Sequence, residues 1–246
     1  MKNLLSIELY KLRTTPAAWV SLALTIAFSA ASVVLNVFTV NPGGPALGSP
    51  EHVSKALSVS AMTSMVMLAI GVIMVAGEYR NRTIMQTFLG EPRRAKVLVA
   101  KAVTALGLGT VLGAGTFGLG YLEAMLVYGA RGVESLPVDV TQLWVGATVS
   151  TALYGLVGIA LGALTRNTVA AIIGAMGWIL VVEIGILANV IPDYAQWLPG
   201  GAAVALTSVH SATGGLSPTT AGLVLAGWAV AIAAVAARFS LSREAH

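Results

Sequence analysis

The stretch QLWVGATVSTALYGLVGIALGAL, residues Gln142–Leu164, contains no charged side chain. A helix needs about 20 consecutive apolar residues to cross the hydrocarbon core of a bilayer. This stretch is therefore predicted to span a membrane. The composition of the whole chain agrees, because 57% of its 246 residues are hydrophobic and 10% are charged, whereas soluble domains carry about 25% charged residues. We expect an all-α integral membrane protein.

Five other apolar segments flank this stretch and are long enough to span. They are Ala17–Thr39, Leu57–Ala76, Leu98–Tyr128, Val169–Ile191 and Thr219–Ala237. The segment Leu98–Tyr128 is longer than one span requires, so it is expected to tilt or to project beyond the membrane. A cleaved signal peptide is the alternative for the first segment, but its apolar run of about 23 residues exceeds the usual 7–15. Residues 1–246 are thus interpreted as a single six-span domain.

The Lys and Arg residues fall mainly on one side of this arrangement. With both termini cytoplasmic, the inner segments contain twelve of them: Lys2, Lys11, Arg13, Arg80, Arg82, Arg93, Arg94, Lys96, Lys101, Arg166, Arg238 and Arg243. The outer segments contain Lys55 and Arg131. This positive-inside bias predicts a multi-pass protein of the cell membrane with both termini cytoplasmic. The net charge of +4 forms no isolated basic face, so nucleic acid is not expected as a partner.

The sequence contains none of the common catalytic or nucleotide-binding motifs. It has no G-x-x-x-x-G-K-[ST] loop, no H-E-x-x-H pair and no G-x-S-x-G elbow. The absence of cysteine excludes disulfides and thiolate metal sites. We expect the chain not to be an enzyme, and to hold no cofactor or metal of its own.

Glycines recur at helical spacing within the predicted spans. Gly109 and Gly113 form one small-xxx-small pair, and Gly158 and Gly162 form another. Such pairs allow membrane helices to approach closely. The sequence GAGTFG, Gly113–Gly118, matches the dinucleotide pattern G-x-G-x-x-G, but it lies inside an apolar span and follows no strand, so it is also interpreted as helix packing.

Two carboxylates fall inside predicted spans. Glu183 lies near the middle of the fifth span, and Glu123 lies toward the outer end of the third. An ionisable group at membrane depth is costly and faces a bundle interior, a cavity or a partner. Both residues are candidates for a translocation path. For Glu183 the alternative is a structural hydrogen bond to another span, and for Glu123 it is a place at the outer interface.

The connection between the fifth and sixth spans is too long for a tight turn and contains no Lys or Arg. It runs over residues 192–218, and its moderately apolar centre is too short to cross a bilayer. Short interfacial or re-entrant helices are predicted here, with Tyr194 and Trp197 at the head-group level. His210 has no spaced partner and is interpreted as a surface histidine.

A second charged connection follows the second span. GEYRNRTIMQTFLGEPRRAKVLVAK, Gly77–Lys101, holds six of the fourteen Lys and Arg residues. Ile84, Met85 and Phe88 form an apolar face, and a Gly followed by a Pro ends the pattern. A short amphipathic helix is predicted over residues 78–89. The basic residues after it are interpreted as membrane anchors: Arg93, Arg94, Lys96 and Lys101.

The leader, residues 1–16, also has an amphipathic pattern. Leu5, Leu9 and Leu12 recur at helical spacing, while Glu8 and Lys11 fall on another face. This pattern is typical of a helix that lies in the membrane interface. A simple basic anchor is the alternative interpretation.

The leader and the charged connection together resemble a known family. SIELYKLRTTP and EYRNRTIMQTFLGEPRRAKVLVAKA are similar to segments of the permease subunits of type-2 ABC transporters, chiefly small six-span bacterial exporters. In that family a segment after the second span, the coupling helix, contacts separate ATPase subunits. The resemblance implies coupling-interface roles for a set of residues in this segment: Glu78, Tyr79, Arg80, Arg82, Thr83, Ile84, Gln86 and Phe88. It places the leader helix beside them, around Glu8, Lys11 and Arg13.

The resemblance also implies partners and a function. A second permease, identical or related, would complete the translocation path, and ATP and Mg would be bound by the partner ATPase. The expected function is ATP-driven export of a hydrophobic or amphipathic compound, such as a drug, a peptide or a lipid-like molecule, which is the activity of multidrug-resistance exporters. The alternative is a non-transport membrane scaffold, immunity or sensor subunit.

Overall fold

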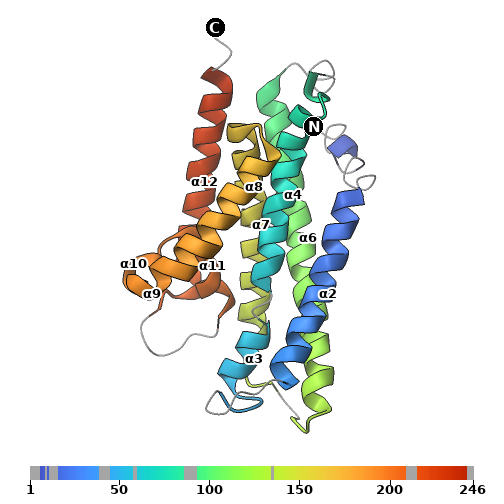
Figure 1. Cartoon of the computed structure of the whole chain (residues 1–246), viewed down its shortest axis with the longest axis vertical. Helices are drawn as coiled ribbons and strands as arrows, with labels where there is room; N and C mark the ends of the chain where they lie inside the picture. Colours follow the sequence, from blue (N-terminus) through green and yellow to red (C-terminus); the bar gives the residue numbers. More distant parts are fainter. Residues whose placement is uncertain are drawn as a thin grey trace.

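The computed structural model describes residues 6–8, 10, 16–38, 45–57, 60–85, 93–133, 136–208 and 215–242, and this part of the chain contains helices and no strand. Figure 1 shows a bundle of long helices that run roughly side by side, with shorter helices between them. The long and short helices in chain order are α2 (Pro16–Phe38), α3 (Pro50–Leu57), α4 (Ser60–Arg80), α6 (Arg94–Gly129), α7 (Val140–Thr165), α8 (Thr168–Met176), the π-helix η1 (Gly177–Leu187), α9 (Ala188–Val190), α10 (Pro192–Ala195), α11 (Pro199–Thr207) and α12 (Pro218–Ser242).

Five segments of the described chain are long and apolar enough to cross a membrane. They contain α4, α6, α7, the continuous run from α8 to α9, and α12. The all-α class and the multi-pass character are thereby confirmed. In α2 the apolar part is Thr25–Phe38, which is too short to be counted as a span. The six-span layout therefore stays a prediction.

The helices differ at their ends from the predicted spans. α4 continues past Ala76 to Arg80, and α6 begins at Arg94, before the predicted Leu98. Both extensions carry charged side chains, which a helix tolerates where it leaves the hydrocarbon core. With 36 residues, α6 is the longest described helix, and at 1.5 Å per residue it measures about 54 Å against a core of about 30 Å. The prediction that this segment projects beyond one span agrees with its length.

α7 lies at the centre of the bundle and packs against α4, α6 and α12. Glycine makes the contacts with α4 and α6 close. A Cβ on Gly158 would collide with the carbonyl oxygen of Leu68, and a Cβ on Gly109 would come 2.6 Å from Cα of Ala152. The predicted role of the glycine pairs in helix packing is confirmed. Hydroxyl groups add a buried polar contact, because Ser64 Oγ lies 3.1 Å from Ser150 Oγ across the α4–α7 interface.

The fifth predicted span is not a regular α-helix. Its central eleven residues form η1, and Glu183 lies within it. π-Helices are rare, short and frequent at functional sites. After η1 and α9, the short helices α10 and α11 lead into α12. The prediction that this connection contains short helices is confirmed, and their interfacial or re-entrant position stays a prediction. His210 lies outside the described residues.

Candidate functional site

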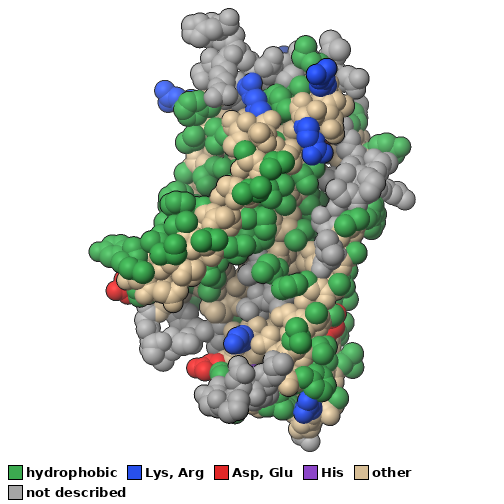
Figure 2. All heavy atoms as spheres, viewed as in Figure 1, with side chains coloured by type: hydrophobic (Ala, Val, Ile, Leu, Met, Phe, Trp, Pro, Cys, Tyr) green, Lys and Arg blue, Asp and Glu red, His purple; other side chains and the backbone are tan. Residues whose placement is uncertain are grey.

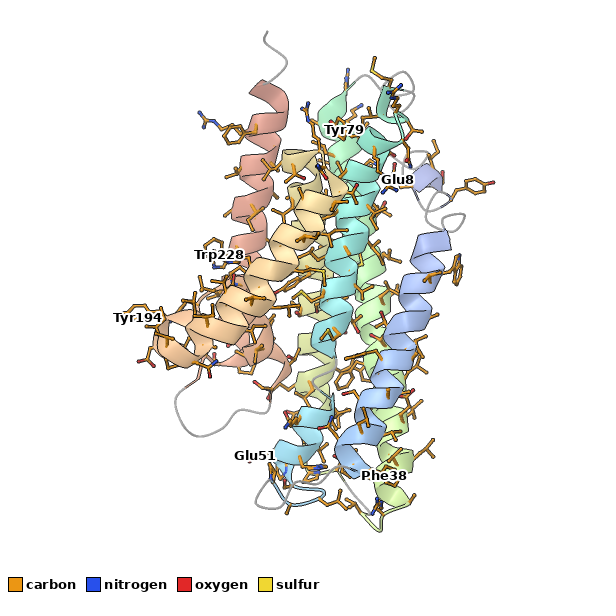
Figure 3. All side chains as sticks on the ribbon, viewed as in Figure 1. Glu8, Phe38, Glu51, Tyr79, Tyr194 and Trp228 are labelled. Atoms are coloured by element: carbon orange, nitrogen blue, oxygen red, sulfur yellow. The ribbon has the colours of Figure 1, made fainter. Side chains whose placement is uncertain are left out.

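Several polar segments meet at one end of the bundle, which we call the coupling end because it contains the described part of the predicted coupling segment, residues 78–85. It is formed by Ser6–Glu8, the last turn of α4, the first turns of α6, the α7–α8 turn and the last turns of α12. Figure 3 shows Glu8 and Tyr79 at this end, and Glu51 and Phe38 at the opposite end. The segments Ser6–Glu8 and the end of α12 thus lie on the same side of the bundle.

A tight turn follows α4 at this end. The amide of Thr83 donates to the carbonyl oxygen of Glu78 at 3.0 Å, and Arg82 adopts a left-handed backbone with φ of 57°. Ile84 and Met85 are again helical. The predicted start of a separate helix at residue 78 is therefore wrong, because Glu78, Tyr79 and Arg80 complete α4. Gln86, Phe88 and the predicted helix end lie outside the described residues.

Lys101 is the centre of a buried ion cluster. Its Nζ lies 2.8 Å from Glu8 Oε2 and 2.9 Å from Glu78 Oε1. Nζ also donates to the carbonyl oxygen of Met74 at 2.9 Å. An ammonium group has three N–H donors, so each has an acceptor. The cluster connects the leader, α4 and α6, three segments that are distant in the sequence.

This cluster corrects one interpretation made from the sequence. Lys101 is not a membrane anchor, because 1% of the residue is exposed and its ammonium group is bonded to both carboxylates. Glu78 is 8% exposed and its side chain faces the interior of the bundle, and its role at a coupling interface stays a prediction. Sequence analysis missed Lys101 because its pairing depends on Glu8, 93 positions away. The signal available in the sequence is that Lys101 lies inside the predicted span Leu98–Tyr128.

Arg166 joins the site from the α7–α8 turn. It is the C-cap of α7, with a left-handed φ of 53°, and its guanidinium carbon lies 5.1 Å from the centre of the Tyr79 ring. A cation over an aromatic face is attracted to the ring's negative quadrupole. Among the described residues, Arg82 and Arg166 are the only non-glycine residues with positive φ, and both lie at this end. The sequence placed Arg166 in a cytoplasmic connection between two predicted spans but did not pair it with Tyr79.

The outer surface of the coupling end is cationic. Arg80, Arg82, Arg93, Lys96 and Arg238 are exposed, whereas the described acidic residues here, Glu8 and Glu78, are buried on Lys101. Figure 2 shows Lys and Arg side chains gathered at this end of the visible face, with the acidic side chains lower on the molecule. Met85 adds an apolar side chain that is 70% exposed.

A comparison with known protein families finds a match. The model described as "ABC-2 family transporter protein" matches residues 4–183, which is more than half of the 246 residues. The chain belongs to this family. The matched region includes the ion cluster, the turn after α4 and Arg166. A comparison with curated proteins gives no match.

Membership in the ABC-2 family confirms the resemblance seen in the leader and the charged connection. It indicates a transport permease role and implies association with an ABC ATPase partner. Lys11 and Arg13, which the resemblance placed beside the coupling segment, lie outside the described side chains. The described parts of the predicted interface divide into buried Glu78, partly buried Tyr79, Thr83 and Ile84, and exposed Arg80 and Arg82.

The two intramembrane carboxylates of this ABC-2 family chain lie away from the coupling end. Glu183 is 1% exposed and accepts a hydrogen bond from the backbone amide of Gly200 at 2.6 Å. Glu123 is partly buried in the last third of α6, one turn before Tyr128. Tyr128 packs at the opposite end of the bundle, where its hydroxyl oxygen lies 2.6 Å from Nδ1 of His52. The structure does not bring Glu123 and Glu183 together as a shared site.

Proposed function

We propose that this chain is the membrane-spanning subunit of an ATP-driven exporter, and that a separate ABC ATPase docks at the coupling end. The observation that carries the proposal is the exposed turn after α4, at residues 80–85, held by a buried ion cluster directly beneath it. Family membership supports the general role. The cytoplasmic orientation of this end is supported by the positive-inside bias.

The ion cluster supplies a mechanical link in this proposal. Motion of a docked ATPase moves the turn and the last turn of α4, where Glu78 is bonded to Lys101. Lys101 passes the displacement to α6 and, through Glu8, to the leader. The glycine contacts between α4 and α7 are so close that these two helices move together. The spans therefore shift as rigid bodies between an inward-facing and an outward-facing arrangement.

The proposal includes a second permease and a substrate class. Two copies, or this chain and a related one, enclose the path, and the exposed apolar faces of α2, α6 and α12 are available to lipids and to that second permease. The cargo is a hydrophobic or amphipathic compound, such as a drug, peptide or lipid-like molecule, because few charges line the spans. ATP and Mg are bound by the partner ATPase and not by this chain.

Reversal of charge at the turn tests the docking site. The chain is co-expressed with an ABC ATPase from the same genome, and co-purification and ATP hydrolysis are measured. We expect Arg82→Glu to reduce recovery of the ATPase about tenfold or more, since a like charge at an interface costs several kcal/mol. Arg238→Glu is the matched control, because Arg238 is an exposed Arg at the same end on α12; it should change recovery less than about twofold.

The same experiment separates transport from the alternative function. A scaffold, immunity or sensor subunit would bind partners without making ATP hydrolysis depend on the permease. If Arg82→Glu and Arg238→Glu give equal recovery of the ATPase and equal ATP hydrolysis, the turn after α4 is not part of the interface. Failure of the wild-type chain to recruit any ATPase, with no hydrolysis that depends on it, would contradict the transporter function.

A further inference from the structure

The short helix α11 has no means of its own to satisfy its first backbone donor. It contains nine residues, Pro199–Thr207, and at 1.5 Å per residue it extends about 13 Å, less than half of a bilayer core. Its N-cap residue, Leu198, provides no side-chain acceptor, and Pro199 has no N–H. The amide of Gly200 is therefore the first donor of the helix, and in an apolar environment it needs an acceptor from elsewhere.

Glu183 of η1 supplies that acceptor. Its Oε2 accepts from Gly200 N at 2.6 Å, and Glu183 is 1% exposed. A carboxylate at a helix N-terminus is favoured by the helix dipole and by the charge-assisted hydrogen bond. Glycine is required for this approach, since a Cβ on Gly200 would come 2.8 Å from Oε2 and 3.0 Å from Cγ2 of Ile179.

Two other helices hold the same end of α11. The hydroxyl of Tyr154, on α7, donates to the carbonyl oxygen of Pro199 at 3.2 Å. Nε1 of Trp228, on α12, donates to the carbonyl oxygen of Trp197 at 2.9 Å. The N-terminal end of α11 is thus bonded to η1, α7 and α12, and Glu183 is the one carboxylate among these three anchors.

We propose that Glu183 is a positioning residue that fixes α11 against the bundle, and not a ligand for substrate or ion on a translocation path. α10 and α11 connect the fifth predicted span to α12. If η1 or α11 is displaced, the bond between Glu183 and Gly200 must either break or move the other helix with it. The bond therefore sets whether α11 moves with η1 or separates from it. The consequence for export rests on the proposed function, whereas the contact itself does not.

The position of α11 can be measured in the permease alone. The natural chain has no cysteine, so two introduced cysteines are the only sites for nitroxide labels. Val204 on α11 is 42% exposed and Leu126 on α6 is 75% exposed, and neither takes part in the three anchors. The distance distribution between the two labels reports the position of α11 relative to α6.

Three variants distinguish an anchor from a charged site. Glu183→Gln keeps an oxygen that accepts from Gly200, so a single narrow distribution like that of the unsubstituted chain is expected. Glu183→Leu removes the acceptor and should broaden or shift the distribution. Glu123→Leu, the matched control, removes the other intramembrane carboxylate and should leave it unchanged. An unchanged distribution in Glu183→Leu would overturn the proposal.

Transport measured with the partner ATPase gives the second readout. Glu183→Leu should lower transport about tenfold or more, the factor that a charge-assisted hydrogen bond is worth, and Glu183→Gln should stay within about twofold. Loss of transport in Glu183→Gln with α11 in place would overturn the proposal in favour of a charged role on the path. If Glu183→Leu does not fold, Gly200→Ala carries the same test. Failure of the chain to recruit an ATPase contradicts the proposed function and leaves the label measurement intact.

Discussion

The coupling end and the fifth predicted span bury carboxylates in different ways. At the coupling end, Glu8 and Glu78 share the ammonium group of Lys101, and the three groups come from three separate segments. In the fifth predicted span, Glu183 is held by a backbone amide of α11. Lys101 and its two carboxylates attract one another only while these side chains stay charged and close together. The contact of Glu183 with the N-terminus of α11 requires one acceptor oxygen, which the neutral side chain of Gln also has. We therefore expect substitutions to destabilise the two regions to different extents.

The largest effect is expected from Lys101→Met. Removal of one partner from a buried ion pair costs about 3–5 kcal/mol, because the other charges remain buried without compensation. The free energy of unfolding, measured by titration of detergent micelles with SDS, should fall by that amount. Lys96→Met is the matched control, since Lys96 is exposed on the same helix. Equal stability of Lys101→Met and Lys96→Met would show that the cluster contributes nothing.

A charge exchange tests the pair itself. Lys101→Glu combined with Glu78→Lys restores opposite charges at about the same separation, so the double variant should be more stable than Lys101→Glu alone by about 1–3 kcal/mol. The same unfolding titration measures it. A double variant no more stable than the single one would mean that Glu8 and the carbonyl of Met74, and not Glu78, hold Lys101.

Neutral amides compare the two regions directly. Glu78→Gln keeps an acceptor oxygen but removes the negative charge that faces the ammonium group of Lys101, so it should cost about 1.5–3 kcal/mol. Glu183→Gln keeps an acceptor oxygen for an uncharged amide donor and should cost about 1 kcal/mol or less. Unfolding of the two variants in the same detergent gives the ratio. If Glu183→Gln proves the more destabilising, the charge of Glu183, and not its oxygen, stabilises α11.

The smallest effect is expected from Arg166→Leu. Loss of the cation from the face of Tyr79 should cost about 0.5–1 kcal/mol at this partly exposed site. Tyr79→Phe keeps the ring and should have little effect on stability, which makes it the control for the ring contact. If the two variants are equally stable, the 5.1 Å approach of Arg166 to the ring adds nothing measurable to stability.

Part of the fold follows directly from the sequence. Uninterrupted apolar runs such as Gln142–Leu164 predict helices, because a backbone inside a bilayer must satisfy its own hydrogen bonds. The predicted ranges lie close to those of α4, α6, α7, α8–α9 and α12. The motif in residues 77–101 indicated the family, which the family comparison then established. The glycine pairs were correctly assigned to packing, since small residues at fixed spacing have one common use in membrane helices.

Other features depended on groups that are distant in the sequence. Periodicity assigned residues 78–80 to a new helix, but α4 continues through them and the chain turns at Arg82. Composition made Lys101 an anchor, but the leader and α4 bring two carboxylates to its ammonium group. The pattern around Glu183 left a path and a structural bond open, and only the return of the chain at Pro199 places an amide against it. Local spacing determines which helices form, whereas the partner of a buried charge depends on how those helices pack in three dimensions.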